Sequence, residues 1–411
     1  MSSFVKADNK FLGSFLLLLM LMIATVASTP MLGKSIWFVL PLILSLIYIL
    51  NVANYNSLMR GVIVYLIIVI SYRLIGVSDA GLGDYMQHIF FFIPIFFMIY
   101  LYRIKSSSNK KKCWYLMMLV MAINVFVNIY MSIKYPSINL KSVRMFYGED
   151  FLQSMNIGGS KFFNFVFFFY MVCFFVFLNT EKKRIKIAML VISLMSGTYI
   201  LAFCYKASVM LFLILITVFL IYAKRTKRIL RLAIISLFSG IIGMVIISNY
   251  ENEVIEMIIK MSPDQRVTQR LVTLVDSEAD EANDATVTGR SELYQMSIET
   301  WIATPANFVF GIGDHRSQNN ARATGISQHS DLLDSLARYG LIGLLLLFLI
   351  FKKSFIFISS FFDRRLQIQL YCIFGVTIMF GLMKSLFTPA IGCVFFLLLP
   401  LSSNFVNKQI Q

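Results

Sequence analysis

The sequence predicts an all-α integral membrane protein with about twelve transmembrane helices and one long loop outside the membrane. Hydrophobic residues make up 58% of the 411-residue chain, and charged residues make up only 14%. A soluble domain contains roughly 25% charged residues. Apolar runs long enough to cross a bilayer, which takes about 20 residues, recur along the chain, and clusters of basic residues separate them.

The predicted spans are read from these apolar runs. The first is expected to be a retained span, because no small-residue cleavage site of the kind that ends a signal peptide follows it. Nine spans fall within residues 1–249 and three within 331–411, and a polar segment at 250–330 separates the two groups. The spans cover residues 11–27, 36–52, 61–76, 85–102, 114–133, 161–179, 187–204, 207–223, 230–249, 332–351, 366–385 and 389–405.

Basic residues mark one side of the membrane. They cluster in the connections after the fourth, sixth, eighth and tenth spans, which all lie on the same side. The positive-inside rule makes this side cytoplasmic, places both termini there and leaves the 250–330 segment outside. These residues act as a topology signal and are also expected to contact anionic membrane lipids. This role explains the net charge of +16, so nucleic acid is not an expected partner. They are Arg103, Lys105, Lys110–Lys112, Lys182, Lys183, Arg184, Lys186, Lys224, Arg225, Lys227, Arg228, Arg231, Lys352, Lys353, Arg364 and Arg365.

The external loop is predicted to contain two amphipathic helices. Apolar residues recur at helical spacing over 254–259 and again over 294–302. The second helix is expected to have its N-cap at Thr288 or Ser291 and to end near Pro305. Two helices that lie on the membrane surface fit this pattern better than an unstructured linker.

Several basic residues fall in or beside the outer half of the bilayer. A charge inside the membrane usually faces the bundle interior or a wet cavity and suggests function, although Arg73 and Lys384 could instead extend to the lipid headgroups. Arg290 adds a cation at the start of the second amphipathic helix. Because guanidinium groups bind phosphate bidentately and stay charged, such a cluster suits a lipid-linked diphosphate. Its predicted members are Arg73, Lys206, Arg290, Arg338 and Lys384.

His329 is the best candidate for acid/base chemistry. It opens the tenth span, with Asp331 and Asp334 close in sequence. An imidazole titrates near neutral pH and can take a proton from a sugar hydroxyl. Either carboxylate could orient the ring. The other two histidines are expected in less specific places, His88 within the core of the fourth span and His315 in a loop.

Other classes of chemistry lack their motifs. The sequence has no Walker A or Rossmann glycine pattern and no HExxH zinc motif. All five cysteines fall in or at the edges of predicted spans, so neither disulfides nor a cysteine metal site is expected. No metal or other cofactor is therefore predicted. No cytoplasmic segment is long enough for a nucleotide-sugar domain, so a glycosyl donor would have to arrive attached to a lipid.

The end of the polar segment resembles a known motif. His329-Ser330 is followed by nine residues, Gly340, two residues and Gly343. This spacing resembles the O-antigen polymerase and ligase superfamily of bacterial surface-polysaccharide assembly, in whose ligases the external loop ends in the same pattern. The Thr-Gly-Arg that ends at Arg290 and the Gly-Ile-Gly at 311–313 resemble the same loop. Lys206 departs from the family, whose ligases usually carry arginine in that short external turn.

The resemblance implies a GT-C-like, metal-independent glycosyltransferase of the bacterial cytoplasmic membrane, with its active site facing the periplasm or exterior. It implies an undecaprenyl-diphosphate-linked glycan as donor, with His329 and Arg290 as catalytic residues. A polymerase is expected, because Leu-Ala-Arg-Tyr-Gly-Leu-Ile-Gly at 336–343 resembles capsule and O-antigen polymerases. A ligase that transfers the glycan to lipid A-core or another acceptor is the alternative, and a lipid-linked glycan transporter is a third. Membrane lipids and a chain-length regulator are the expected further partners.

Overall fold

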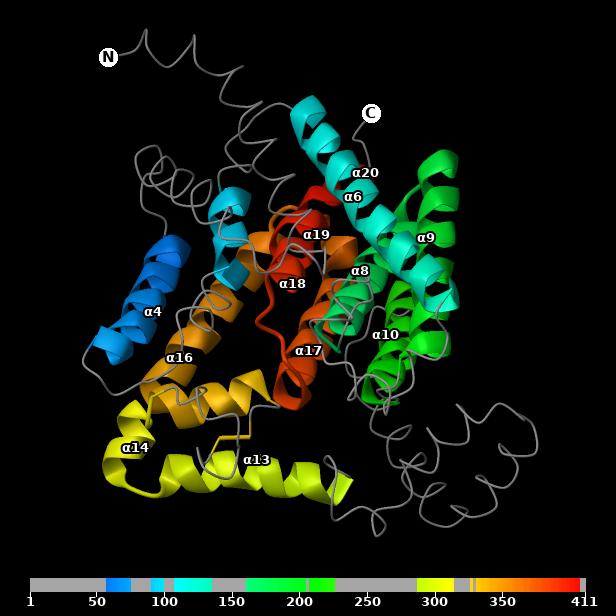
Figure 1. Ribbon diagram of the computed structural model, residues 1–411. Helices are drawn as coiled ribbons and strands as arrows, with labels where there is room; N and C mark the ends of the chain where they lie inside the picture. The colour runs from blue at the N-terminus through cyan, green and yellow to red at the C-terminus, as the bar shows by residue number, and fades with distance from the viewer. Residues whose placement is uncertain are drawn as a thin grey trace, which may run out of the picture.

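The computed structural model describes residues 57–74, 90–99, 107–134, 160–204, 207–225, 287–313, 326–327 and 330–406. All of the secondary structure in these residues is helical. Most of the helices form a bundle, and two of them lie across one of its ends (Figure 1).

Six of the described helical segments are long and apolar enough to cross a membrane, as judged by length and composition. Three shorter apolar helices accompany them, namely α4 (Ser57–Leu74), the helix at Phe90–Ile99 and α10 (Ala207–Arg225). The six are α6 (Ser107–Lys134), α8 (Ser160–Asn179), α9 (Lys183–Phe203), α16 (Asp331–Ser359), α17 (Gln367–Met383, after the short η4 at Arg364–Leu366) and the C-terminal segment Pro389–Val406. This last segment is divided into α18 (Pro389–Cys393), the π-helix η5 (Val394–Leu398), α19 (Leu399–Leu401) and α20 (Ser403–Val406).

These helices confirm the prediction of an all-helical membrane protein. Each of the six long and three shorter helices coincides with a predicted span. The predicted spans at 11–27, 36–52 and 230–249 lie outside the described residues, as does the first predicted amphipathic helix at 254–259. The total of about twelve spans therefore stays a prediction.

The phenylalanine-rich helix α8 is the centre of the bundle. It packs against α9, α10 and the C-terminal segment, and most of its side chains are buried. The ring of Phe167 stacks on Phe380 of α17 at a centroid distance of 5.2 Å, and Phe163 stacks on Tyr199 of α9 at 5.4 Å. Such aromatic contacts add to the packing that holds membrane helices together.

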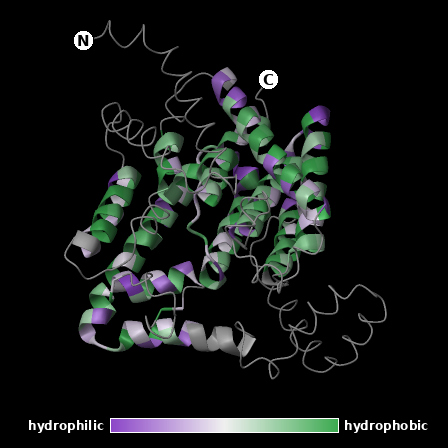
Figure 2. Ribbon diagram, in the orientation of Figure 1, coloured by the Kyte–Doolittle hydropathy of each residue, from purple (hydrophilic) through white to green (hydrophobic). Residues whose placement is uncertain are grey.

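Helix α6 has the opposite character and lies at the edge of the bundle. Apolar residues spaced three or four apart form an exposed stripe along one of its faces. A stripe of this kind is expected where a helix faces lipid, since lipid tails are as apolar as leucine side chains. Figure 2 shows that hydrophobic residues predominate along the helices of the bundle. The stripe consists of Tyr115, Leu119, Ile123, Phe126, Tyr130 and Ile133.

Helices α13 (Val287–Ile302) and α14 (Pro305–Phe310) lie across one end of the bundle, which we call the α13 end (Figure 1). The second predicted amphipathic helix is thus confirmed as a helix, although it begins before both predicted caps. It ends before Pro305, as predicted, and Thr304 caps α14 by accepting a hydrogen bond from the Asn307 N–H at 3.0 Å. Ile298 and Ile302 of the predicted apolar stripe are 40% and 57% exposed, so this part of the stripe faces away from the protein.

Basic residues gather at the other end of the bundle, which we call the basic end. The Lys224 ammonium donates a hydrogen bond to the Leu178 carbonyl, so the ends of α10 and α8 lie together. The Arg365 guanidinium donates to the Val406 carbonyl at 2.6 Å. Helix α16 begins at the α13 end and finishes five residues before Arg364, so the two ends are separated by the length of this helix.

Candidate functional site

The α13 end is organised around a kink in α16. Gly340 interrupts the helix with φ of 60° and ψ of −164°. Glycine adopts a positive φ at little cost because it has no Cβ. A Cβ at this position would also lie 2.4 Å from the carbonyl carbon of Val309. The sequence predicted one span over 332–351, whereas Figure 1 shows the part of α16 before Gly340 turned across the bundle end, beside α13 and α14.

The kink joins α16 to the end of α14. The Ile312 N–H donates to the Ala337 carbonyl, and the Gly313 N–H donates to the Arg338 carbonyl, both at 2.9 Å. A kink leaves such carbonyls without their helical donors, and these two bonds satisfy them. Gly311 has φ of 75°, and a Cβ there would lie 2.3 Å from the carbonyl carbon of Arg338. The Gly-Ile-Gly at 311–313 and Gly340 therefore lie on the two sides of one close contact between backbones.

Substitution of Gly340 by alanine is expected to destabilise the protein. The added methyl group strains a positive-φ residue, which costs about 1–3 kcal/mol, and it collides with the backbone at Val309. The midpoint of thermal unfolding, measured on the detergent-purified protein, should fall. Gly375→Ala in α17 is the matched control, because no atom of the described residues lies within 4 Å of a Cβ there. Equal midpoints for the two variants would contradict this account.

The N-terminus of α16 is hydrogen-bonded to the end of α17 and to the loop after it. Ser330 caps α16 by accepting the Leu333 N–H at 3.2 Å, and its hydroxyl donates to the Gly381 carbonyl at 3.3 Å. The Asp331 carboxylate accepts the N–H groups of Leu386 and Phe387 at 2.7 and 2.6 Å. A carboxylate in the first turn also interacts favourably with the helix dipole. These bonds fix the start of α16, whose N-cap residue Ser330 directly follows His329 in sequence.

Asp334 lies at the centre of a buried polar network and is 1% exposed. Its Oδ1 atom accepts the hydroxyl of Ser297 from α13 at 3.0 Å and that of Ser327 at 2.5 Å. The Ser327 N–H in turn donates to the Ser297 hydroxyl at 2.8 Å. A guanidinium nitrogen of Arg338, one turn further along α16, lies 3.9 Å from the other carboxylate oxygen. The network joins α13, α16 and the chain at 326–327.

The buried cation Lys384 follows α17 at the same end of the molecule. Its side chain is only 6% exposed, and its carbonyl accepts the Asp331 N–H at 3.4 Å. Helix α13 reaches this place through the Tyr294 hydroxyl, which donates to the Met383 carbonyl at 3.0 Å. Positions 290, 294 and 297 share one face of an α-helix, since they are four and seven residues apart. Position 290 therefore lies on the α13 face that is turned toward α16 and α17.

The structure brings together Asp331, Asp334, Arg338 and Lys384. Arg290 lies in α13, one turn before Tyr294, and its side chain is outside the described part. Arg338 is buried beside Asp334. Arg73 is near the end of α4, and its side chain is also outside the described part. For Lys206 and His329, both backbone and side chain lie outside it. Their predicted roles stay predictions.

Sequence reasoning missed the two serines of the buried network, Ser297 and Ser327. Nothing in the sequence distinguishes them from the other serines of the chain. Their importance follows from contacts across 37, 30 and 7 residues, which no local pattern encodes.

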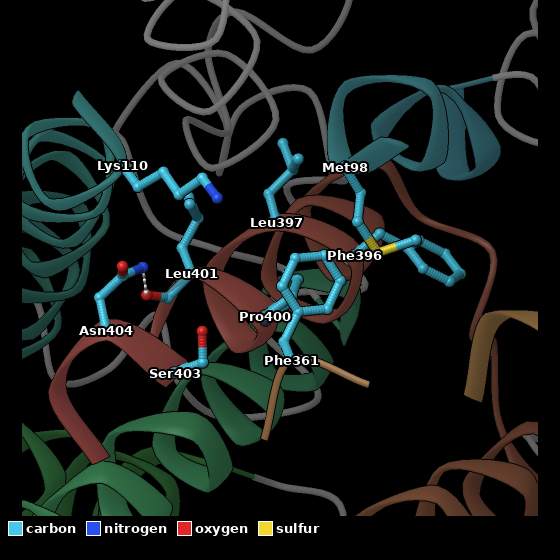
Figure 3. Close-up of a pocket in the computed structure, with 9 residues that line it drawn as sticks. All are labelled: Met98, Lys110, Phe361, Phe396, Leu397, Pro400, Leu401, Ser403 and Asn404. Atoms are coloured by element: carbon cyan, nitrogen blue, oxygen red, sulfur yellow. Dashed lines mark hydrogen bonds between the residues drawn. The ribbon is translucent and has the colours of Figure 1, made fainter. Parts of the chain in front are cut away.

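A cavity of about 40 Å³ lies at the basic end (Figure 3). Lys110 extends toward it from α6, and Asn404 donates a hydrogen bond to the Leu401 carbonyl at 2.9 Å at its wall. None of the predicted site residues lines it, so it is separate from the site at the α13 end. The lining residues are Met98, Lys110, Phe361, Phe396, Leu397, Pro400, Leu401, Ser403 and Asn404.

The fold defines a multi-pass helical membrane protein with a polar cluster at one end. Residues 190–348 match the model of the O-antigen ligase family. This part of the chain is therefore an O-antigen ligase family domain, which confirms the resemblance seen in the sequence. The matched region contains α13, α14 and the kink of α16. Enzymes of this family transfer lipid-linked glycans in bacterial surface-polysaccharide biosynthesis. No curated protein shows a significant match to the chain.

Proposed function

We propose that the protein is a polysaccharide polymerase. It transfers a glycan from undecaprenyl diphosphate to the end of another lipid-linked repeat unit, without a metal ion. The observation that carries this proposal is the family domain over residues 190–348, within which α13 and the kinked start of α16 meet beside the buried cation Lys384. A cation beside a membrane helix end suits the diphosphate of a lipid carrier.

The candidate site residues have two different roles in the proposed reaction. His329 takes the proton from the acceptor hydroxyl as its oxygen attacks the anomeric carbon of the donor glycan. The bond between that carbon and the phosphate oxygen breaks, and undecaprenyl diphosphate leaves. Cationic side chains stabilise the negative charge that develops on this leaving group. The proposed diphosphate-binding residues are Lys206, Arg290, Arg338, Arg73 and Lys384.

The α13 end is proposed to face the periplasm or exterior. Lys224 at the end of α10 and Arg365 after α16 lie at the opposite end, and the positive-inside rule assigns that end to the cytoplasm. An impermeant thiol reagent applied from outside should modify a cysteine placed at Asp280 and spare one placed at Ser107. The reverse labelling pattern would invert the orientation.

The exposed residues Ile298 and Ile302 of α13 support a membrane-surface position for this helix. An amphipathic helix in the interfacial plane buries its apolar face at the boundary between headgroups and acyl chains. This position would hold α13, and with it Arg290, at the depth where the diphosphate of a polyprenyl carrier lies.

The proposed function is tested with purified protein in vesicles that contain lipid-linked repeat units alone. A polymerase produces a ladder of lengthened glycans from this single substrate. The second candidate is a ligase, which the description of the matched family favours. A ligase gives product only when a second lipid acceptor is added. Movement of the donor across the membrane without any lengthening would indicate a transporter.

A further inference from the structure

The buried network at Asp334 holds the chain immediately before His329. Ser327 is bound twice, through its hydroxyl to Asp334 and through its N–H to Ser297. Ser330, on the other side of His329, is bound to Leu333 and to Gly381. Ser327 and Ser330 are therefore two anchored residues that flank residues 328 and 329 in the chain.

The same network holds α13 against α16. Ser297 lies two helical turns from Arg290 on the same face of α13. The hydroxyl of Ser297 bonds to both Asp334 and Ser327. One buried group of three side chains therefore joins the chain two residues before the proposed base to the helix that carries the proposed diphosphate-binding arginine.

Stability alone does not account for a buried carboxylate at this place. Burial of an ion pair costs desolvation energy, and apolar residues of similar volume often stabilise a protein as well or better. Asp334 and Arg338 are 1% exposed. Unlike an apolar cluster, the hydroxyls and the carboxylate define the relative orientation of the segments that they join, because each hydrogen bond pairs one donor with one acceptor in a preferred geometry.

We infer that Ser297, Ser327 and Asp334 are positioning residues for His329. They set its distance from the donor diphosphate and do not themselves touch the substrate. The inference rests on the proposed function for its catalytic consequence, and on the hydrogen bonds of the network for its geometry.

The kinetic test compares Ser327→Ala with Ser335→Ala. Displacement of a catalytic group by about 1 Å can cost roughly 100-fold in rate, so Ser327→Ala should lower kcat by about 10- to 100-fold while the KM for the donor changes little. Ser327→Thr keeps the hydroxyl and should recover most of the lost rate. Ser335 is the matched control, because its buried hydroxyl donates to the Asp331 carbonyl within its own helix. Its alanine variant should keep a kcat near that of the unmodified protein.

The geometric test uses hydrogen–deuterium exchange and needs no substrate. Ser297→Ala removes the acceptor of the Ser327 N–H, so the amides at 326–330 should exchange faster in this variant and not in Ser335→Ala. Unchanged exchange would overturn the network. Faster exchange together with an unchanged kcat in Ser327→Ala would overturn its positioning role. Absence of glycan transfer in the unmodified protein would instead count against the proposed function, and exchange would still decide the geometry.

Discussion

Arg290→Ala is expected to reduce glycan transfer about 30- to 4,000-fold. This range follows from a loss of roughly 2–5 kcal/mol when one partner of a buried charge-assisted contact is removed, at 1.4 kcal/mol for each factor of ten. Position 290 lies on the α13 face that reaches α17 through Tyr294, close in the chain to the buried network. The guanidinium is proposed to stabilise the diphosphate as it leaves. Product is measured by glycan lengthening in vesicles.

The control for this variant removes an arginine that has no proposed role. Arg364 is exposed at the basic end, and its alanine variant should retain full activity at the same level of membrane insertion. Lys206→Arg should also be tolerated, since it restores the residue that the related ligases usually carry. Polymer formation near the unmodified level in Arg290→Ala would remove this arginine from the site.

The membrane spans could be predicted because bilayer thickness fixes their length. Helix α8 illustrates this, since the span predicted at 161–179 is observed at Ser160–Asn179. Its apolar run is long, and polar residues border it on both sides. Where polar residues of this kind set the ends of a helix, those ends can be predicted from the sequence.

The kink of α16 could not be predicted in the same way. Gly340 lies in a run that has helical apolar spacing, and glycine is tolerated within membrane helices. The positive φ depends on the approach of the α14 end, where Gly311 and Val309 meet the backbone of α16. The two segments are about thirty residues apart, so the reason for the kink lies in tertiary contact. The motif spacing drew attention to Gly340 without revealing its conformation.

The sequence also left open which carboxylate assists His329. The structure gives the two candidates different partners. Asp331 accepts two backbone N–H groups 55 and 56 residues away, whereas Asp334 binds the serines of α13 and of the chain before His329. The two carboxylates lie three residues apart in the first turn of α16 and still bind different segments, so their spacing in the sequence could not choose between them.

His329→Ala is expected to lower turnover by about 10²- to 10⁴-fold, which is the usual contribution of a general base. Donor binding should persist, because the proposed diphosphate contacts come from other residues. Turnover and donor affinity are measured in the same variant. An unchanged turnover number with weaker donor binding would remove the base role, since a residue that only hydrogen-bonds a phosphate oxygen contributes to affinity.

His329→Gln separates the two roles more sharply. Glutamine retains a hydrogen-bond donor, but its amide does not take up a proton near neutral pH. If His329 accepts the proton of the acceptor hydroxyl, the glutamine variant should be as slow as the alanine variant. If His329 instead donates a hydrogen bond to the leaving diphosphate, glutamine should restore most of the activity that alanine loses. Such recovery would assign His329 to binding and require another residue as the catalytic base.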